Sequence, residues 1–132
     1  MQWSWLHVPD KPRSGIGEPL RIIVLGYIVR CPIGGMAWHH LQYVMGLSGM
    51  GHEVVFVEDS GDSEWSCYDP ASGETSTNPG YGLKFAQQAY TQVGLPDKWC
   101  YHDAFTSRWL GPFSGKIEAY CRDADLLLNL SG

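Results

Sequence analysis

Two adjacent glycines, Gly34 and Gly35, are the residues of this chain best suited to hold an anionic ligand. They follow an apolar run at residues 21–29 and precede a segment with helical periodicity. Glycine lets a ligand approach the backbone closely, and the N-terminus of a helix carries about half a positive charge together with unpaired N–H groups. We therefore expect a phosphate-bearing ligand at this loop.

Two familiar phosphate-binding motifs do not match the loop. A P-loop needs a Lys followed by Ser or Thr directly after its glycines, and no Lys follows here. A dinucleotide fingerprint needs GxGxxG directly after the strand, but residues 26–35 read GYIVRCPIGG. Only Glu58 matches that second motif, since it ends the next predicted strand, where dinucleotide-binding folds place a ribose-binding acid.

Other side chains are candidates for the same cleft, each with an ordinary structural alternative. His39 is predicted to project away from the apolar face of its helix, either toward a phosphate or acceptor or into solvent. Glu58 and Asp59 are expected at the carboxyl edge of the sheet, unless they only begin a solvated acidic loop. Arg30 is a candidate phosphate contact, with a surface ion pair as the alternative. The sequence identifies no catalytic residue and no metal site.

A βαβ unit over residues 21–59 is predicted to position these groups. The nearly continuous apolar run from Arg21 to Val29 is typical of a central strand in a parallel sheet that helices cover on both faces. Gly51 is expected to end the helix, and a second strand follows from His52 or Glu53 to Val57. The predicted core-facing stripe of the helix is Ala37, Leu41, Val44, Met45 and Ser48.

The remaining elements are predicted from shorter patterns. Residues 59–79 are expected to form a long loop, residues 80–93 a helix, and Trp99–His102 an edge strand. Ser114 is the predicted N-cap of a helix with Ile117, Tyr120 and Cys121 inward, and Ala124–Leu130 is a last strand. The sequence therefore predicts an α/β, Rossmann-like, three-layer domain with a mainly parallel sheet over residues 21–132, after an irregular leader at residues 1–20. Because such a domain seldom finishes on a buried strand, we expect it to be truncated.

Composition restricts the class of partner. The net charge of −5 and the scattered basic residues argue against a nucleic-acid surface. The four cysteines show no paired spacing of a zinc site and are expected to be reduced thiols. The N-terminus lacks the pattern of a secretory signal, and no apolar run has the length of a transmembrane segment. A cytoplasmic protein is the expectation.

The spacing of several short motifs resembles the N-terminal domain of two-domain (GT-B type) glycosyltransferases. The resemblance is carried by Gly34-Gly35 after the first strand, His39 four residues later, Leu41 and Leu47 in the helix, and GHEV at residues 51–54. A looser match lies at residues 124–127, where the family has a strand that often begins with Ala-Asp.

The resemblance implies a transferase role that needs a second domain. In that family the double-glycine loop approaches the diphosphate of a nucleotide-sugar donor, so Gly34, Gly35 and His39 are the implied diphosphate contacts. The chain would be the acceptor-side half, acting on an unknown acceptor together with a donor-binding domain in cis or in trans. It would need no cofactor, because the nucleotide-sugar is a substrate. The alternative is a non-catalytic Rossmann-like binding or interaction module.

Overall fold

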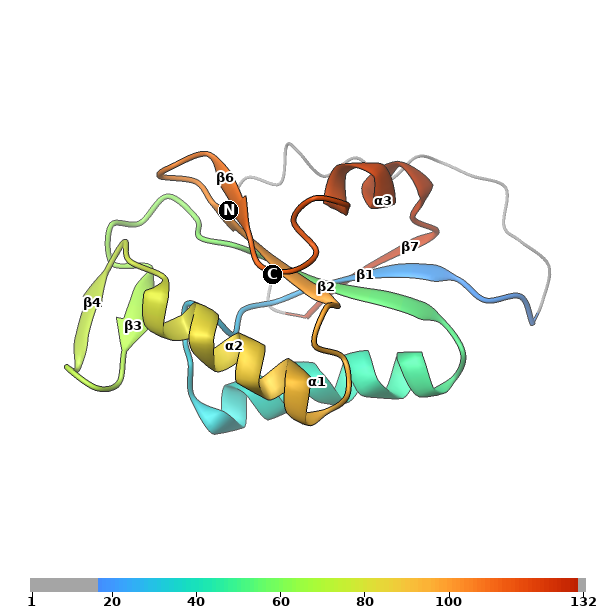
Figure 1. Cartoon of the computed structure of the whole chain (residues 1–132), viewed down its shortest axis with the longest axis horizontal. Coiled ribbons are helices and arrows are strands. Elements are labelled where there is room, and N and C mark those ends of the chain that lie inside the picture. Colours follow the sequence, from blue (N-terminus) through green and yellow to red (C-terminus); the bar gives the residue numbers. More distant parts are fainter. Residues whose placement is uncertain (1–16, 131–132) are drawn as a thin grey trace.

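The computed structural model describes residues 17–130, which form a five-stranded sheet between two layers of helices (Figure 1). Four strands run parallel, and β6 is antiparallel to β5 at one edge. The α/β class and the mainly parallel sheet are therefore confirmed. The spatial order is β6 (Arg108–Leu110), β5 (Trp99–Asp103), β2 (Glu53–Asp59), β1 (Arg21–Leu25) and β7 (Leu126–Asn129).

Strands β1 and β2 are apolar on both faces because helices cover both sides of the sheet. Helices α1 (Gly34–Gly49) and α2 (Gly80–Gln92) pack on one face, and α3 (Ile117–Asp123) packs on the other (Figure 1). Ile22 and Val24 of β1 belong to the core under α1 and α2, whereas Ile23 and Leu25 belong to the core under α3. This alternation follows from the two-residue period of a strand.

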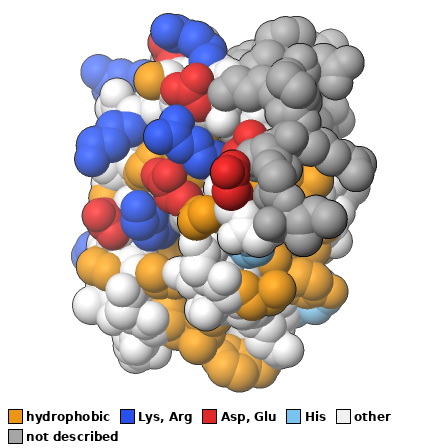
Figure 2. All heavy atoms as spheres, turned by 90° about the vertical axis from the view of Figure 1, so that its right-hand side faces the viewer, with side chains coloured by type: hydrophobic (Ala, Val, Ile, Leu, Met, Phe, Trp, Pro, Cys, Tyr) orange, Lys and Arg blue, Asp and Glu red, His pale blue; other side chains and the backbone are white. Residues whose placement is uncertain are grey.

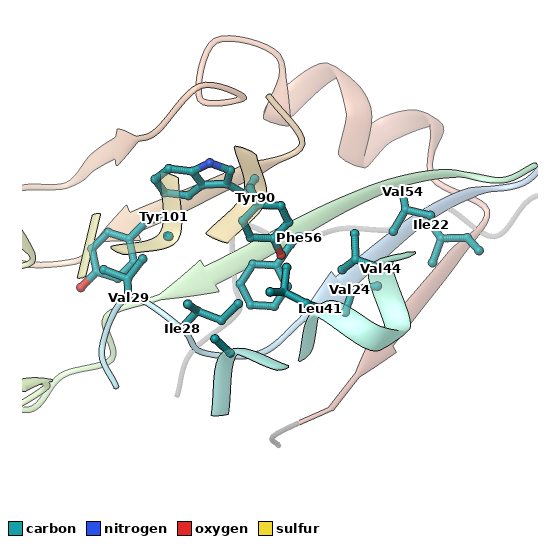
Figure 3. Close-up of a cluster of buried hydrophobic side chains, with 13 residues drawn as sticks. Ile22, Val24, Ile28, Val29, Leu41, Val44, Val54, Phe56, Tyr90 and Tyr101 are labelled. Carbon is teal, nitrogen blue, oxygen red and sulfur yellow. The ribbon is translucent and has the colours of Figure 1, made fainter. Parts of the chain in front are cut away.

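The core under α1 and α2 is the larger of the two clusters. Figure 3 shows it with Phe56 of β2 beside Tyr90 of α2, and the two ring centroids are 5.9 Å apart. As predicted, Ala37, Leu41 and Val44 face this core. The predicted inward position of Met45 is wrong, because Met45 is 37% exposed; the fourth buried residue of α1 is His40.

The predicted turn between α1 and β2 is confirmed. Gly51 has φ +91°, a left-handed conformation that glycine adopts without strain, and its N–H donates to the carbonyl of Ser48. The first strand is shorter than predicted, because it ends at Leu25 and residues 26–33 leave the sheet.

The segment at residues 59–79 contains a hairpin that the prediction of a loop missed. Strands β3 (Cys67–Asp69) and β4 (Glu74–Ser76) pair antiparallel, and at three residues each they are too short for a periodic signal. Helix α2 agrees with its prediction to within one residue.

Three predictions in the last third of the chain need correction. The last strand, β7, is not buried, because it lies at the edge of the sheet and its four residues are partly or fully exposed. β5 is not an edge strand, because β6 pairs with its outer side and β6 itself was not predicted. Helix α3 begins after Lys116, not after Ser114, although Ile117, Tyr120 and Cys121 are buried as predicted. Residues 1–16 of the predicted leader lie outside the described residues. Within residues 17–130, no helix combines the length and apolar character needed to cross a membrane.

Candidate functional site

The strand order places a topological switch point at β1. From β1 the chain adds β2 and then β5 on one side, and it later places β7 on the other side of β1. The helices of the first connections cover one face, whereas α3, which leads into β7, covers the opposite face. In open α/β sheets, ligands bind beyond the carboxyl ends of the strands at such a point. The expected site therefore lies beyond the ends of β1 and β7.

A hollow of about 430 Å³ lies at this position. Tyr27, which follows β1, and Leu130, which follows β7, form part of its wall. The rest comes from the first turns of α1. This volume is within the usual range of small-molecule sites. The α1 residues that line the hollow are Gly35, Met36, His39 and His40.

The N-terminus of α1 that opens into the hollow is uncapped by any described side chain. The N-cap residue is Ile33, which cannot accept a hydrogen bond through its side chain, and the first turn contains no acidic residue. The first N–H groups of a helix have no partner within the helix, and they carry the positive end of its dipole. The wall formed by described residues is also free of carboxylates. The hollow is therefore suited to an anion.

Glycine at positions 34 and 35 is not required by packing within the described chain. Both residues are exposed, and neither has a positive φ. A Cβ built on either one meets no described atom within 4 Å. The space in front of these two residues is open, which allows a ligand to reach the backbone.

The loop that leads from β1 to α1 is fixed by one buried carboxylate, that of Glu58. The N–H groups of Ile28 and Val29 both donate to its Oε2 at 2.7 Å, and the N–H of Arg30 donates to Oε1 at 2.8 Å. Glu58 is 0% exposed. Burial raises its pKa, while the Arg30 guanidinium and the three N–H groups act in the opposite direction. Glu58 therefore positions the loop and does not line the hollow, in contrast to the expectation from sequence.

Arg30 lies close to the hollow but outside its wall. Its Nε is 3.4 Å from Oε1 of Glu58, and its Cζ lies 5.0 Å from the ring centroid of Tyr27. The ion pair that was the structural alternative for Arg30 thus exists, with a buried partner. Its positive charge lies over the face of the ring that lines the hollow, which is a cation–π contact.

His40 joins the floor of the hollow to the loop. Its Nδ1–H donates to the carbonyl of Met36 at 2.8 Å, and its Nε2 accepts from the N–H of Tyr27 at 3.4 Å. One donor and one acceptor correspond to the neutral imidazole, and burial lowers the pKa of His40. Gly26 makes room for the ring, because a Cβ at this position would collide with Cδ2 of His40.

Asp59 lies at a different part of the sheet edge from the hollow. Its Oδ1 accepts from the N–H of Gly61 at 2.8 Å, and its Oδ2 is 3.5 Å from Nδ1 of His102. Asp59 ends β2 and His102 is in β5, so this pair lies on the side of β2 remote from β7. The structure does not place Asp59 beside Gly35.

Of the three implied diphosphate contacts, Gly35 and His39 line the same hollow. Gly34, the third, lines a groove between α1 and α2. Sequence reasoning missed Tyr27 and Leu130. Both lay inside predicted strands, which the structure ends earlier, at Leu25 and Asn129, so the signal that was missing is where each strand stops.

No family model, curated protein or solved structure matches this chain. Within residues 17–130, no group of three or more His, Cys, Asp or Glu side chains is arranged to hold a metal ion. The groups that the hollow does offer are backbone N–H donors, imidazoles and a phenol ring. Groups of these kinds donate hydrogen bonds to anions and stack on rings.

Proposed function

We propose that this chain is a Rossmann-like, acceptor-side half of a nucleotide-sugar-dependent glycosyltransferase, and that its hollow receives the diphosphate of the donor. The single observation that carries the proposal is the position of the uncapped N-terminus of α1, which opens at the switch point into a hollow with no described carboxylate in its wall. Helix N-termini of this kind bind phosphate groups in α/β folds.

The lining residues support the binding of a diphosphate. The N–H groups of Gly35 and Met36 donate to phosphate oxygens, and His39 supplies an imidazole donor from the same turn of the helix. The ring of Tyr27 gives a nucleoside or sugar group an aromatic surface. Glu58 and His40 hold the loop in place before the ligand arrives, so little ordering accompanies binding.

In sugar transfer, the oxygen of an acceptor hydroxyl bonds to the anomeric carbon, the bond from that carbon to the diphosphate breaks, and the hydroxyl proton passes to solvent water. The leaving nucleoside diphosphate then holds the negative charge, which the dipole of α1 stabilises. The remaining donor contacts would come from a donor-binding domain in cis or in trans. No residue of this chain is assigned the role of catalytic base.

Calorimetric titration with UDP and with GDP tests the binding step directly. Gly35→Val fills the open space before the helix N-terminus, and Gly46→Val is the matched control in the same helix, with the same open surroundings but outside the hollow. We expect the wild type and Gly46→Val to bind alike, and Gly35→Val to bind at least about tenfold more weakly. Equal heats for the wild type and Gly35→Val would rule out the loop as the binding element.

A non-catalytic interaction module is the second candidate function. The observation that favours it is the nearly uncharged outer surface of α1 and α2. Nucleoside diphosphate binding in the hollow is expected for the transferase half and is not expected for a module that only binds another protein.

A further inference from the structure

The outer surface of α1 and α2 differs from the surface of an ordinary solvent-facing helix pair. Helix α1 contains no Asp, Glu, Lys or Arg, and α2 contains one charged residue, Lys84. Figure 2 looks onto the right-hand end of Figure 1, where acidic and basic side chains gather in the upper half and hydrophobic ones in the lower half, at the level of the C-terminal end of α1. Solvent-facing helices normally carry charges on their outer side, and helices without them are normally covered.

Aromatic and sulfur-containing side chains stand exposed on this surface. Trp38 is 54% exposed and Met45 is 37% exposed, and both project from α1. Beside Trp38 lies a groove of about 300 Å³ between the two helices. Its floor includes the small side chains of Ala37 and Ala89, and Gln88 and Gln92 also line it. A protruding indole and a hollow with room for an indole thus lie next to each other.

We propose that this surface binds a second copy of the chain across a two-fold axis, with Trp38 of each copy entering the α1–α2 groove of the other. A two-fold interface requires one surface to carry both the protrusion and the complementary hollow, and this surface carries both. Gln88 and Gln92 suit the same arrangement, because an amide is both donor and acceptor and can pair with its own symmetry copy.

Electrostatics favours a second copy over a charged partner. Each copy carries a net charge of −5, so association through a charged face would bring like charges together. The α1–α2 surface avoids this repulsion, because neither helix contains Asp or Glu. An anionic membrane would need basic residues on this surface, and Lys84 is its single one.

The size of the surface sets the expected affinity. At about 1.5 Å per residue, α1 is about 24 Å long and α2 about 20 Å, and two helices of about 10 Å width cover roughly 450 Å² in projection. Stable complexes bury about 800 Å² per partner, and the α1–α2 surface offers roughly half of that, which corresponds to a weak, transient complex. We therefore expect dissociation constants of about 10–100 μM. The proposal is independent of ligand binding in the hollow.

Sedimentation equilibrium of the full chain between about 5 and 200 μM tests the proposal. The weight-average mass is expected to rise with concentration from the monomer value of 14.7 kDa toward twice that value. Trp38→Glu places a charge in the interface and should stay monomeric throughout. Trp65→Glu is the matched control, because Trp65 is 70% exposed in the β2–β3 connection, outside this surface, and this variant should associate like the wild type.

Far-UV circular dichroism and urea unfolding verify that each variant is folded. If Trp38→Glu fails to fold, Gln88→Glu gives the decisive result, since it adds a charge at the groove without removing an aromatic side chain, and it should weaken association at least about tenfold. A wild type that stays monomeric over the whole concentration range overturns the proposal. Binding of that monomer to neutral phosphatidylcholine vesicles would then point to a membrane as the partner of this surface, and the proposal would still be overturned. Association that survives a charge at Trp38 or Gln88 overturns it as well.

Discussion

Replacing Gly35 with alanine is expected to stabilise the fold while weakening ligand binding. The position is helical, the φ angle is not positive, and a Cβ meets no described atom within 4 Å. Alanine is favoured over glycine in a helix by up to about 1 kcal/mol, and it also reduces the entropy of the unfolded chain. Because Gly35 is in the first turn, we take about half of this value, roughly 0.5 kcal/mol.

For a chain of this length the entropy of unfolding is about 0.28 kcal/mol per degree, so 0.5 kcal/mol corresponds to a Tm increase of about 2 °C. The added methyl group occupies the space through which a phosphate reaches the N–H groups, and we expect the Kd for UDP to rise about three- to tenfold. Scanning calorimetry measures the first effect and titration calorimetry measures the second.

The control for this pair of measurements is Gly46→Ala, which has equally open surroundings in the same helix but lies outside the hollow. It should raise Tm and leave UDP binding unchanged. If Gly35→Ala lowers Tm, the fold itself requires glycine there, and the argument from open space is refuted. If Gly35→Ala raises Tm and UDP binds as before, the ligand does not use this loop.

Three further changes test the supports of the loop. Glu58→Gln replaces one accepting oxygen with an NH2 group, so two N–H donors lose their acceptor. We expect the free energy of unfolding measured in urea to fall by about 3 kcal/mol. The control Glu64→Gln, at an exposed position, should be nearly neutral. Gly82→Ala would drive its Cβ into the backbone oxygen of Val29 in the same loop, so it should destabilise the protein by more than about 2 kcal/mol, whereas Gly46→Ala should not. Burial lowers the pKa of His40 below its ordinary value of 6.5, so as the pH falls the unfolded chain binds a proton before the folded chain does. The free energy of unfolding should therefore fall as the pH drops below about 6.5. His40→Gln should flatten this dependence on pH.

The sequence was sufficient to predict the elements with long, regular apolar patterns. The run after Arg21, the stripe of α1 and the glycine after it each gave a strong local signal, and the structure confirms the βαβ unit that they predicted. Strands of three residues, such as β6, carry no such signal, because two or three positions cannot show a period of two.

The role of Glu58 was beyond the reach of local patterns. A glutamate at the end of a buried strand looks the same whether it faces a ligand or the protein interior. Its burial depends on three N–H groups located 28 to 30 residues earlier in the chain. The hollow was unpredictable for a related reason, because Tyr27 and Leu130 become neighbours only when β7 returns to pair with β1.

A ¹H–¹⁵N NMR titration of the full chain with UDP tests most directly whether the N-terminus of α1 binds a diphosphate. We predict saturable shifts of the amide signals of Gly35, Met36 and His39, with a smaller shift at Leu130, which also lines the hollow but follows β7. Signals at the carboxyl end of β5, such as that of His102, should stay in place. No saturable shift at Gly35 and Met36, or shifts confined to the ends of β2 and β5, would contradict the assignment.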